Sequence, residues 1–142
     1  MKVKEVLAVK GRRVVTVSAK STVAGAIRTM HAEKVGAVLV PDAEGCPVGI
    51  FTERDVVRLY AEGERDFDDL AVEARMTCSL VVGRLSMSVD EALGLMTERR
   101  FRHLPVVEDG KLLGLVSIGD LVKVKLEETA QEAQALRAYI SS

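Results

Sequence analysis

Two copies of one sequence pattern divide this 142-residue chain, and no other feature restricts its fold as strongly. The segment that begins at Val23 matches the segment that begins at Val89 at an offset of 66 residues, which becomes 65 once one residue is dropped near Gly45. The matched pairs are Val23/Val89, Ala26/Ala92, Met30/Met96, Val40/Val106, Gly45/Gly110, Gly49/Gly114, Thr52/Ser117 and Asp55/Asp120. Such a repeat predicts two similar half-domains that stabilise each other, because neither copy can bury its apolar face alone.

Both copies have the same predicted order of elements, β-α-β-β-α. In the first copy we expect strands at 14–17, 36–40 and 48–51 and helices at 22–34 and 53–62. In the second copy we expect strands at 79–82, 103–107 and 112–116 and helices at 89–100 and from 118 onward. Ser88 and Glu91 have the spacing of a capping box before the helix at 89–100. The expected fold class is α/β, more exactly α+β, with two quasi-symmetric halves packed sheet to sheet.

The expected boundaries follow the two copies. The first half covers 1–62 and the second covers 76–127. Residues 63–75 are charged and aperiodic, so they are interpreted as the connector. Residues 128–142 extend the last helix beyond the length of its counterpart in the first copy.

The last helix is predicted to continue to about Ile140, because 123–139 contains neither Gly nor Pro and is rich in good helix formers. Its apolar stripe consists of Leu121, Val124, Leu126, Ala130, Ala133, Leu136 and Tyr139 or Ile140. A stripe of this kind packs on its own module or on a second subunit. Both interpretations stay open, and the second predicts a homodimer.

Composition excludes several classes of protein. Twenty basic and 21 acidic residues give a net charge of −1, which argues against a general binder of nucleic acid or anionic membranes. No stretch reaches the roughly 18 to 20 apolar residues that cross a bilayer. Cys46 and Cys78 are too few for a disulfide framework and are interpreted as packed thiols. A cytoplasmic protein is the expectation.

One repeated motif carries the chemistry: Gly-Ile-Phe-Thr-Glu-Arg-Asp at 49–55 and Gly-Leu-Val-Ser-Ile-Gly-Asp at 114–120. A single hydroxyl residue followed three positions later by a carboxylate is more often a helix capping box than a ligand site. The recurrence at equivalent positions favours a second interpretation. A helix N-terminus with a hydroxyl side chain suits a phosphate, a carboxylate one turn later suits the hydroxyls of a ribose, and Arg54 adds a cation.

With these residues the chain resembles a pair of cystathionine-β-synthase (CBS) domains, the tandem unit called a Bateman module. The resemblance extends from about Val3 to Lys125 and also rests on Arg75-Met76-Thr77 and on Arg-His-Leu-Pro-Val at 102–106. It implies two quasi-symmetric clefts and adenosine ligands such as AMP, ADP, ATP, NAD or S-adenosylmethionine. It also implies that two modules frequently pair into a disc-like dimer.

The resemblance implies a nucleotide site in each half. Thr52 with Asp55, and Ser117 with Asp120, would hold phosphate and ribose, while the strand before each hairpin would line the ligand. The candidate site residues are Thr16, Lys20, Gly36, Ala37, Val38, Thr52, Arg54, Asp55, Arg102, His103, Leu104, Pro105, Ser117, Gly119 and Asp120. The first copy lacks the basic pair Arg102-His103, so the two clefts are expected to differ in charge.

Two further expectations concern the relative nucleotide affinity of the two clefts and the binding of metal ions. Asp55 is expected to matter more for affinity than Asp120, because Arg54 stands where the second motif has Gly119, although Arg102 and His103 can favour either cleft. Three interpretations of His103 stay open, a phosphate contact, a pH-sensitive group or a packed core residue, and its place beside Arg102 favours the phosphate contact. Neither His103 nor His31 has neighbours at metal-ligand spacing, so no metal is expected.

No nucleotide-binding loop, dinucleotide fingerprint or nucleophile set is present in the sequence, so the chain is expected not to be an enzyme. The expected function is regulation through binding of AMP, ADP, ATP or NAD. The module is expected to fill the chain, so its target protein is expected to be a separate one. The alternative is a structural module with vestigial clefts that acts through its last helix.

Overall fold

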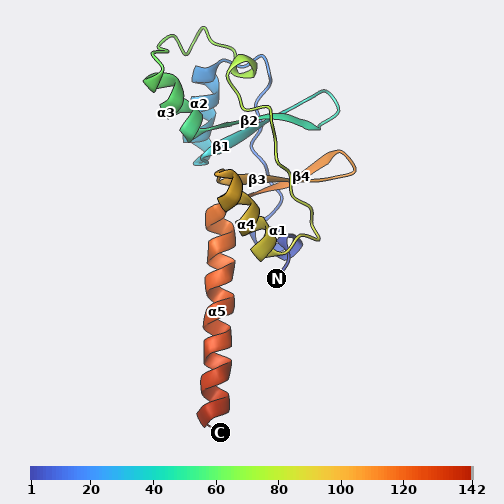
Figure 1. Ribbon diagram of the computed structural model, residues 1–142. Coiled ribbons are helices and arrows are strands. Elements are labelled where there is room, and N and C mark those ends of the chain that lie inside the picture. Colours follow the sequence, from blue (N-terminus) through green and yellow to red (C-terminus); the bar gives the residue numbers. More distant parts are fainter. Residues whose placement is uncertain (142) are drawn as a thin grey trace. The chain divides into compact units, whose positions relative to one another are not determined.

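The computed structural model describes residues 1–141, which form two compact units (Figure 1). Unit 1 consists of residues 1–12, 82–107 and those from 114 onward. Unit 2 consists of residues 13–81 and 108–113. Each unit therefore contains most of one sequence copy together with the first residues of the other copy.

Unit 2 is built on the antiparallel pair β1 (Ala37–Pro41) and β2 (Pro47–Thr52), in which Ala37 lies opposite Thr52. The helices are α2 (Val23–Glu33), α3 (Glu53–Ala61) and the short 3-10 helix η1 (Val72–Ala74). The Thr22 side chain caps α2 by accepting a hydrogen bond from the Gly25 N–H at 3.0 Å. The buried core consists of Val23, Ala26, Met30, Val38, Val40, Phe51, Leu59 and Val72.

Unit 1 contains α1 (Val3–Lys10), α4 (Val89–Arg99), α5 (Ile118–Ser141) and most of β3 (His103–Glu108) and β4 (Lys111–Ser117), whose hairpin end at 108–113 belongs to unit 2. Helix α5 packs against α1 and α4, and β3 pairs with β4. Ser88 caps α4 by accepting from the Glu91 N–H at 3.0 Å. The buried apolar residues of this unit include Val3, Leu7, Val89, Ala92, Met96, Leu104, Val106, Val116 and Leu121.

Helix α1 was not predicted from the sequence. Its apolar residues Val3, Val6 and Leu7 are at most 3% exposed and have helical i, i+3, i+4 spacing. A segment of only eight residues gives too short a pattern for a confident prediction, and its stability comes from packing rather than propensity. Burial of these three side chains makes α1 part of the core of unit 1.

The glycine repeated in both motifs is explained by a close contact. A Cβ atom on Gly114 would lie 2.8 Å from Leu7 Cδ2, and one on Gly49 would lie 2.2 Å from Met76 Sδ. Both distances are shorter than van der Waals contact. Leu7 in unit 1 and Met76 in unit 2 thus occupy equivalent places, each supplied by the first residues of the other copy.

Two of the predicted strands are wrong. The segment 14–17 contributes only an isolated parallel bridge, at Thr16 with Leu39, and the segment 79–82 contributes none, since the matching parallel bridge lies one residue later, at Gly83 with Val106. A turn follows directly in each case, with the Ser21 N–H donating to Ser18 O and the Met87 N–H donating to Arg84 O. The turns end the pairing after one residue, so no ladder forms.

The segment 63–75, interpreted from sequence as the connector, belongs to the packed part of unit 2. Val72 is fully buried, and Phe67 and Leu70 pack against the same core. Their backbone carbonyls accept hydrogen bonds from the first turn of α2, the Val23 N–H donating to Leu70 O at 2.8 Å. The other helices and the four hairpin strands lie within one or two residues of their predicted bounds, and the mixed α+β class is confirmed.

Candidate functional site

The first repeated motif joins β2 to α3 through a reciprocal capping box. The Thr52 N–H donates to Asp55 Oδ2 at 2.9 Å, and the Asp55 N–H donates to Thr52 Oγ1 at 3.3 Å. The Thr52 hydroxyl also lies 3.3 Å from Asp55 Oδ2 as a donor. The motif therefore satisfies two N–H groups at the start of α3, as the capping interpretation requires.

Asp55 is held from further directions within unit 2. Its Oδ1 lies 3.4 Å from Arg58 Nη2 and accepts a hydrogen bond from the Thr77 hydroxyl at 3.5 Å. The residue is only 7% exposed. Both carboxylate oxygens are thus engaged by protein groups, and a ligand hydroxyl would have to share or replace the contacts to Arg58 and Thr77.

The second motif repeats the capping box at the start of α5. The Ser117 N–H donates to Asp120 Oδ2 at 2.8 Å, and the Asp120 N–H donates to Ser117 Oγ at 3.1 Å. Lys10 from α1 adds a salt bridge of 2.6 Å to the same Oδ2 and donates to Leu115 O at 2.6 Å. The Asp120 side chain remains 27% exposed, against 10% for Asp55.

The environment of Asp120 lowers the pKa of its carboxyl group. Burial alone would raise this pKa, but the hydrogen bond and charge of Lys10, together with the hydrogen bonds from Ser117, outweigh it. The carboxylate is therefore stabilised in its charged form, beside the ammonium group of Lys10.

We expect Lys10→Met to raise the pKa of Asp120, because burial then acts with less opposition. A carboxyl whose folded pKa is depressed stabilises the fold above its unfolded pKa of about 4 and loses this contribution as the pH falls through the folded value. Wild type should therefore be more stable than the variant near neutrality, by no more than about 1 kcal/mol for a partly exposed pair, and the difference should shrink in acid. Titration of the Asp120 carboxyl carbon by NMR measures the pKa, with Lys4→Met on the same helix as the control. An equal midpoint in all three proteins would contradict the assignment.

In both units the residue just before the first hairpin strand accepts a backbone hydrogen bond from the first residue of the motif helix. The Glu53 N–H donates to Gly36 O at 3.0 Å, and the Ile118 N–H donates to Arg102 O at 2.9 Å. The side chains at these matched positions differ, however. Unit 2 places the Glu53 carboxyl group beside Gly36, where an added Cβ would lie 3.4 Å from Glu53 Cδ, whereas unit 1 carries Arg102 and an uncharged Ile118.

The remaining candidate residues occupy three kinds of position. Ala37, Val38, Leu104 and Pro105 are buried in β1 and β3, so their side chains contribute to the cores. Lys20 pairs with Glu73 at 3.1 Å, and its side chain is 85% exposed. The others are His103, which is half-buried, and Thr16, Arg54 and Gly119, which are exposed.

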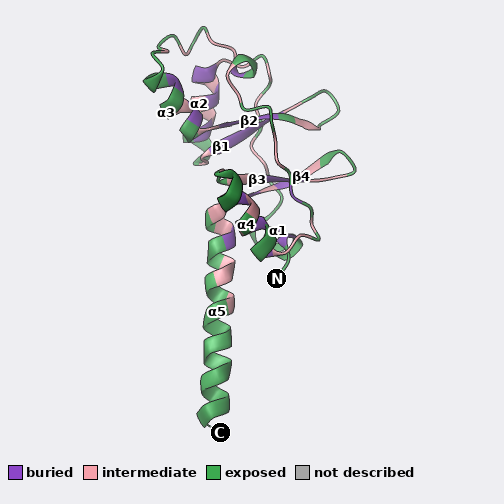
Figure 2. Cartoon of the chain, in the orientation of Figure 1, coloured by how far each residue is buried: buried purple, intermediate pink, exposed green. Residues whose placement is uncertain are grey.

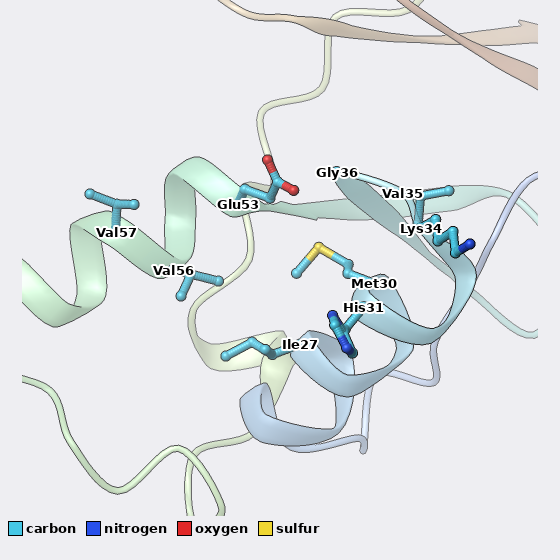
Figure 3. A pocket seen from close by; sticks show the side chains of 9 residues that line it. All are labelled: Ile27, Met30, His31, Lys34, Val35, Gly36, Glu53, Val56 and Val57. Carbon is cyan, nitrogen blue, oxygen red and sulfur yellow. The ribbon is translucent and has the colours of Figure 1, made fainter.

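An apolar pocket of about 720 Å³ opens on unit 2 between α2 and α3, at the start of β1 (Figure 3). Its lining residues are Ile27, Met30, His31, Lys34, Val35, Gly36, Glu53, Val56 and Val57. Of the predicted site residues only Gly36 belongs to it. Thr52 and Asp55 do not line this pocket, but Glu53 between them does, so the pocket adjoins the motif at the start of α3.

Sequence reasoning missed three residues that contact the motif carboxylates: Lys10, Arg58 and Thr77. Lys10 lies 110 residues from its partner Asp120. The basic cluster Lys10-Gly11-Arg12-Arg13 was the one sequence feature that could have indicated a role for Lys10 in binding an anion. Arg58 follows Asp55 by three positions, which is a salt-bridge spacing on a helix. Thr77 belongs to Arg75-Met76-Thr77, a sequence on which the family resemblance partly rests.

Residues 1–141 contain no group of three His, Cys, Asp or Glu side chains placed to hold a metal ion. Within the same residues, no helix combines the length and apolar character that crossing a membrane requires.

The chain belongs to the CBS domain family. The family model matches residues 3–62 and 69–127, one domain for each sequence copy. A CBS domain-containing protein from Agrobacterium tumefaciens of known crystal structure is 43% identical, with a TM-score of 0.84 over 88% of this chain and 99% of that one. The mitochondrial CBS domain-containing protein CBSX3 of Arabidopsis thaliana is 37% identical over 84% of this chain, which spans 60% of the length of that relative.

Two more distant structures share the fold and contain ligands. A CBS domain protein from Pyrobaculum aerophilum, 24% identical with a TM-score of 0.75 over 84% of this chain and 89% of that one, is complexed with AMP. The CBS domain pair of protein MJ0100, 20% identical with a TM-score of 0.79 over 90% of this chain and 98% of that one, is complexed with 5′-methylthioadenosine and S-adenosyl-L-methionine.

Proposed function

We propose that this chain is a regulatory module without catalytic activity that binds an adenosine nucleotide, such as AMP, ADP, ATP or NAD, through its repeated motifs. The observation that carries the proposal is the capping box present in both units, with a hydroxyl side chain and a carboxylate at the start of a helix. The N–H groups of a helix start favour a phosphate, and a carboxylate accepts from ribose hydroxyls. The adenosine ligands of two structures with this fold support the choice of ligand class.

The charges favour the motif of unit 1 as the stronger phosphate site. Lys10 pairs with Asp120, Arg102 directly precedes β3, and Ile118 adds no charge at the first position of α5. In unit 2 the corresponding helix position carries Glu53, whose carboxylate opposes an anion at the start of α3. We therefore expect the Ser117/Asp120 motif to bind phosphate more tightly than the Thr52/Asp55 motif.

The remaining parts of the proposal concern partners. A homodimer and a separate target protein are proposed, because the exposed part of α5 offers a surface for a second subunit. The same exposure favours the alternative candidate, an oligomerisation module whose nucleotide sites are vestigial. The two candidates differ in whether a nucleotide binds at all.

A thermal-shift experiment separates them. A ligand at 100 times its dissociation constant adds about 2.7 kcal/mol to the free energy of unfolding, which for a chain of this size corresponds to a rise in melting temperature of roughly 5 to 10 °C. We expect AMP, ATP or NAD to give such a rise and the matched guanosine nucleotide to give a smaller one. Mass spectrometry of the molecules released on denaturation identifies any ligand that copurifies. If no adenine compound shifts the melting temperature, the sensor proposal fails and the oligomerisation module remains.

A further inference from the structure

Helix α5 carries, from Val122 to Ile140, an apolar seam with the period of a coiled coil. Alternate spacings of four and three residues join Val122, Leu126, Thr129, Ala133, Leu136 and Ile140, which are the a and d positions of successive heptads. All six residues are exposed, with Leu126 at 65%, Leu136 at 60% and Ile140 at 72%. Exposed apolar residues in such a regular pattern mark an interaction surface.

This seam is not the face by which α5 packs on unit 1. The packed face contains Leu121, which is buried, and Lys125 and Glu128, which are half-buried. Lys125 pairs with Asp90 of α4 at 3.0 Å, and Glu128 pairs with the amino terminus at 3.0 Å. Since successive residues are about 100° apart on a helix, the seam lies about a quarter of a turn from this face. Figure 2 shows that the later turns of α5 are exposed all round.

The charged residues beside the seam indicate which helix packs against it. Glu132 is at position g and Arg137 at the following position e of the heptad. In a parallel pair of helices the g side chain approaches the e side chain five residues further along the other helix. Two copies of α5 in parallel therefore place Glu132 of each chain beside Arg137 of the other, which gives two opposite-charge pairs from one sequence.

An antiparallel pairing fits the apolar residues but not the charges. It would place Leu126 opposite Leu136, so the seam would still be filled. The flanking positions would then bring Glu132 against Glu132 and Arg137 against Lys123 of the second copy. Both are like-charge contacts, which oppose association.

We propose that α5 forms a parallel, in-register two-stranded coiled coil with α5 of a second copy of this chain. The proposal rests on the homodimer in the proposed function and names its surface. It does not depend on nucleotide binding, because none of the seam residues belongs to either motif. The assembled form would bury four large apolar side chains per chain, with the small Thr129 and Ala133 at the centre of the seam.

Replacement of a seam residue by a charge tests the surface. We expect Leu136→Lys to halve the mass of the assembly measured by light scattering at micromolar concentration, because two lysines would meet in the seam. Gln131→Lys, at position f on the outer side of the same helix, is the matched control and should leave the mass unchanged. A wild-type mass of 15.4 kDa, or equal masses for wild type and Leu136→Lys, would overturn the proposal.

Charge reversal tests the orientation. In the parallel arrangement Glu132→Arg and Arg137→Glu should each raise the dimer dissociation constant by about tenfold, and the double variant should restore it, since two partly exposed pairs change sign. Within one helix the two residues are five positions apart and do not face each other, so rescue requires a second chain. Stronger association of Arg137→Glu would instead indicate the antiparallel arrangement and overturn the proposal. Adenosine nucleotide titration of Leu136→Lys distinguishes failure of the dimer from failure of the sensor.

Discussion

Leu7→Ala is expected to lower the free energy of unfolding by about 2 to 5 kcal/mol, the range for deletion of a buried leucine side chain. Leu7 is 0% exposed and packs against Gly114, where no side chain could fill the space that the substitution leaves. The cost would be notable for a residue so near the N-terminus, where chain ends usually tolerate change. Urea denaturation followed by circular dichroism measures it, and the slope m should stay constant.

Val9→Ala is the matched control for this substitution. Val9 lies on the same helix, two residues from Leu7, and is 90% exposed. Its replacement removes almost no buried area, so the expected change is within about 0.5 kcal/mol. If Leu7→Ala and Val9→Ala gave the same midpoint, α1 would not be part of the core of unit 1.

Asp120→Ala is expected to weaken adenosine nucleotide binding at least tenfold. The substitution removes a charged acceptor, and hydrogen bonds to charged groups contribute about 1.5 to 3 kcal/mol each. Asp120 keeps 27% of its side chain exposed and has Lys10 as its cationic partner. Calorimetric titration of wild type and variant with the nucleotide that gives the largest thermal shift measures the loss.

Asp55→Ala is the comparison that separates ligand binding from capping. Asp55 is more buried and both of its oxygens are engaged by protein groups, so we expect a loss of about 1 to 3 kcal/mol in stability and a smaller loss of affinity than for Asp120. The geometry thus favours the reverse of the ranking expected from Arg54 in the sequence. Unchanged affinity in both variants would place the ligand, if one binds, away from both motifs.

The sequence by itself determined the repeat, the order of the main elements and the positions of the two motifs. Helices α2 and α4 and the four hairpin strands were predictable because apolar periodicity and turn residues are local properties. The motif residues Thr52, Asp55, Ser117 and Asp120 were identified because the same spacing occurs twice. The recurrence favoured a ligand site over helix capping, yet the hydrogen bonds show that each pair does cap its helix.

Tertiary structure alone decided which segments complete each unit and which charges meet the motif carboxylates. Leu7 and Met76 come from the first residues of one copy and pack in the unit built mainly from the other, which no pattern within a copy could reveal. Lys10 reaches Asp120 across 110 residues, and Thr77 reaches Asp55 from the start of the second copy. The predicted strands at 14–17 and 79–82 likewise did not form, because pairing requires a partner as well as β-branched residues. Contacts between residues far apart in the chain depend on how the elements pack, and packing energies are not encoded in the spacing of neighbouring residues.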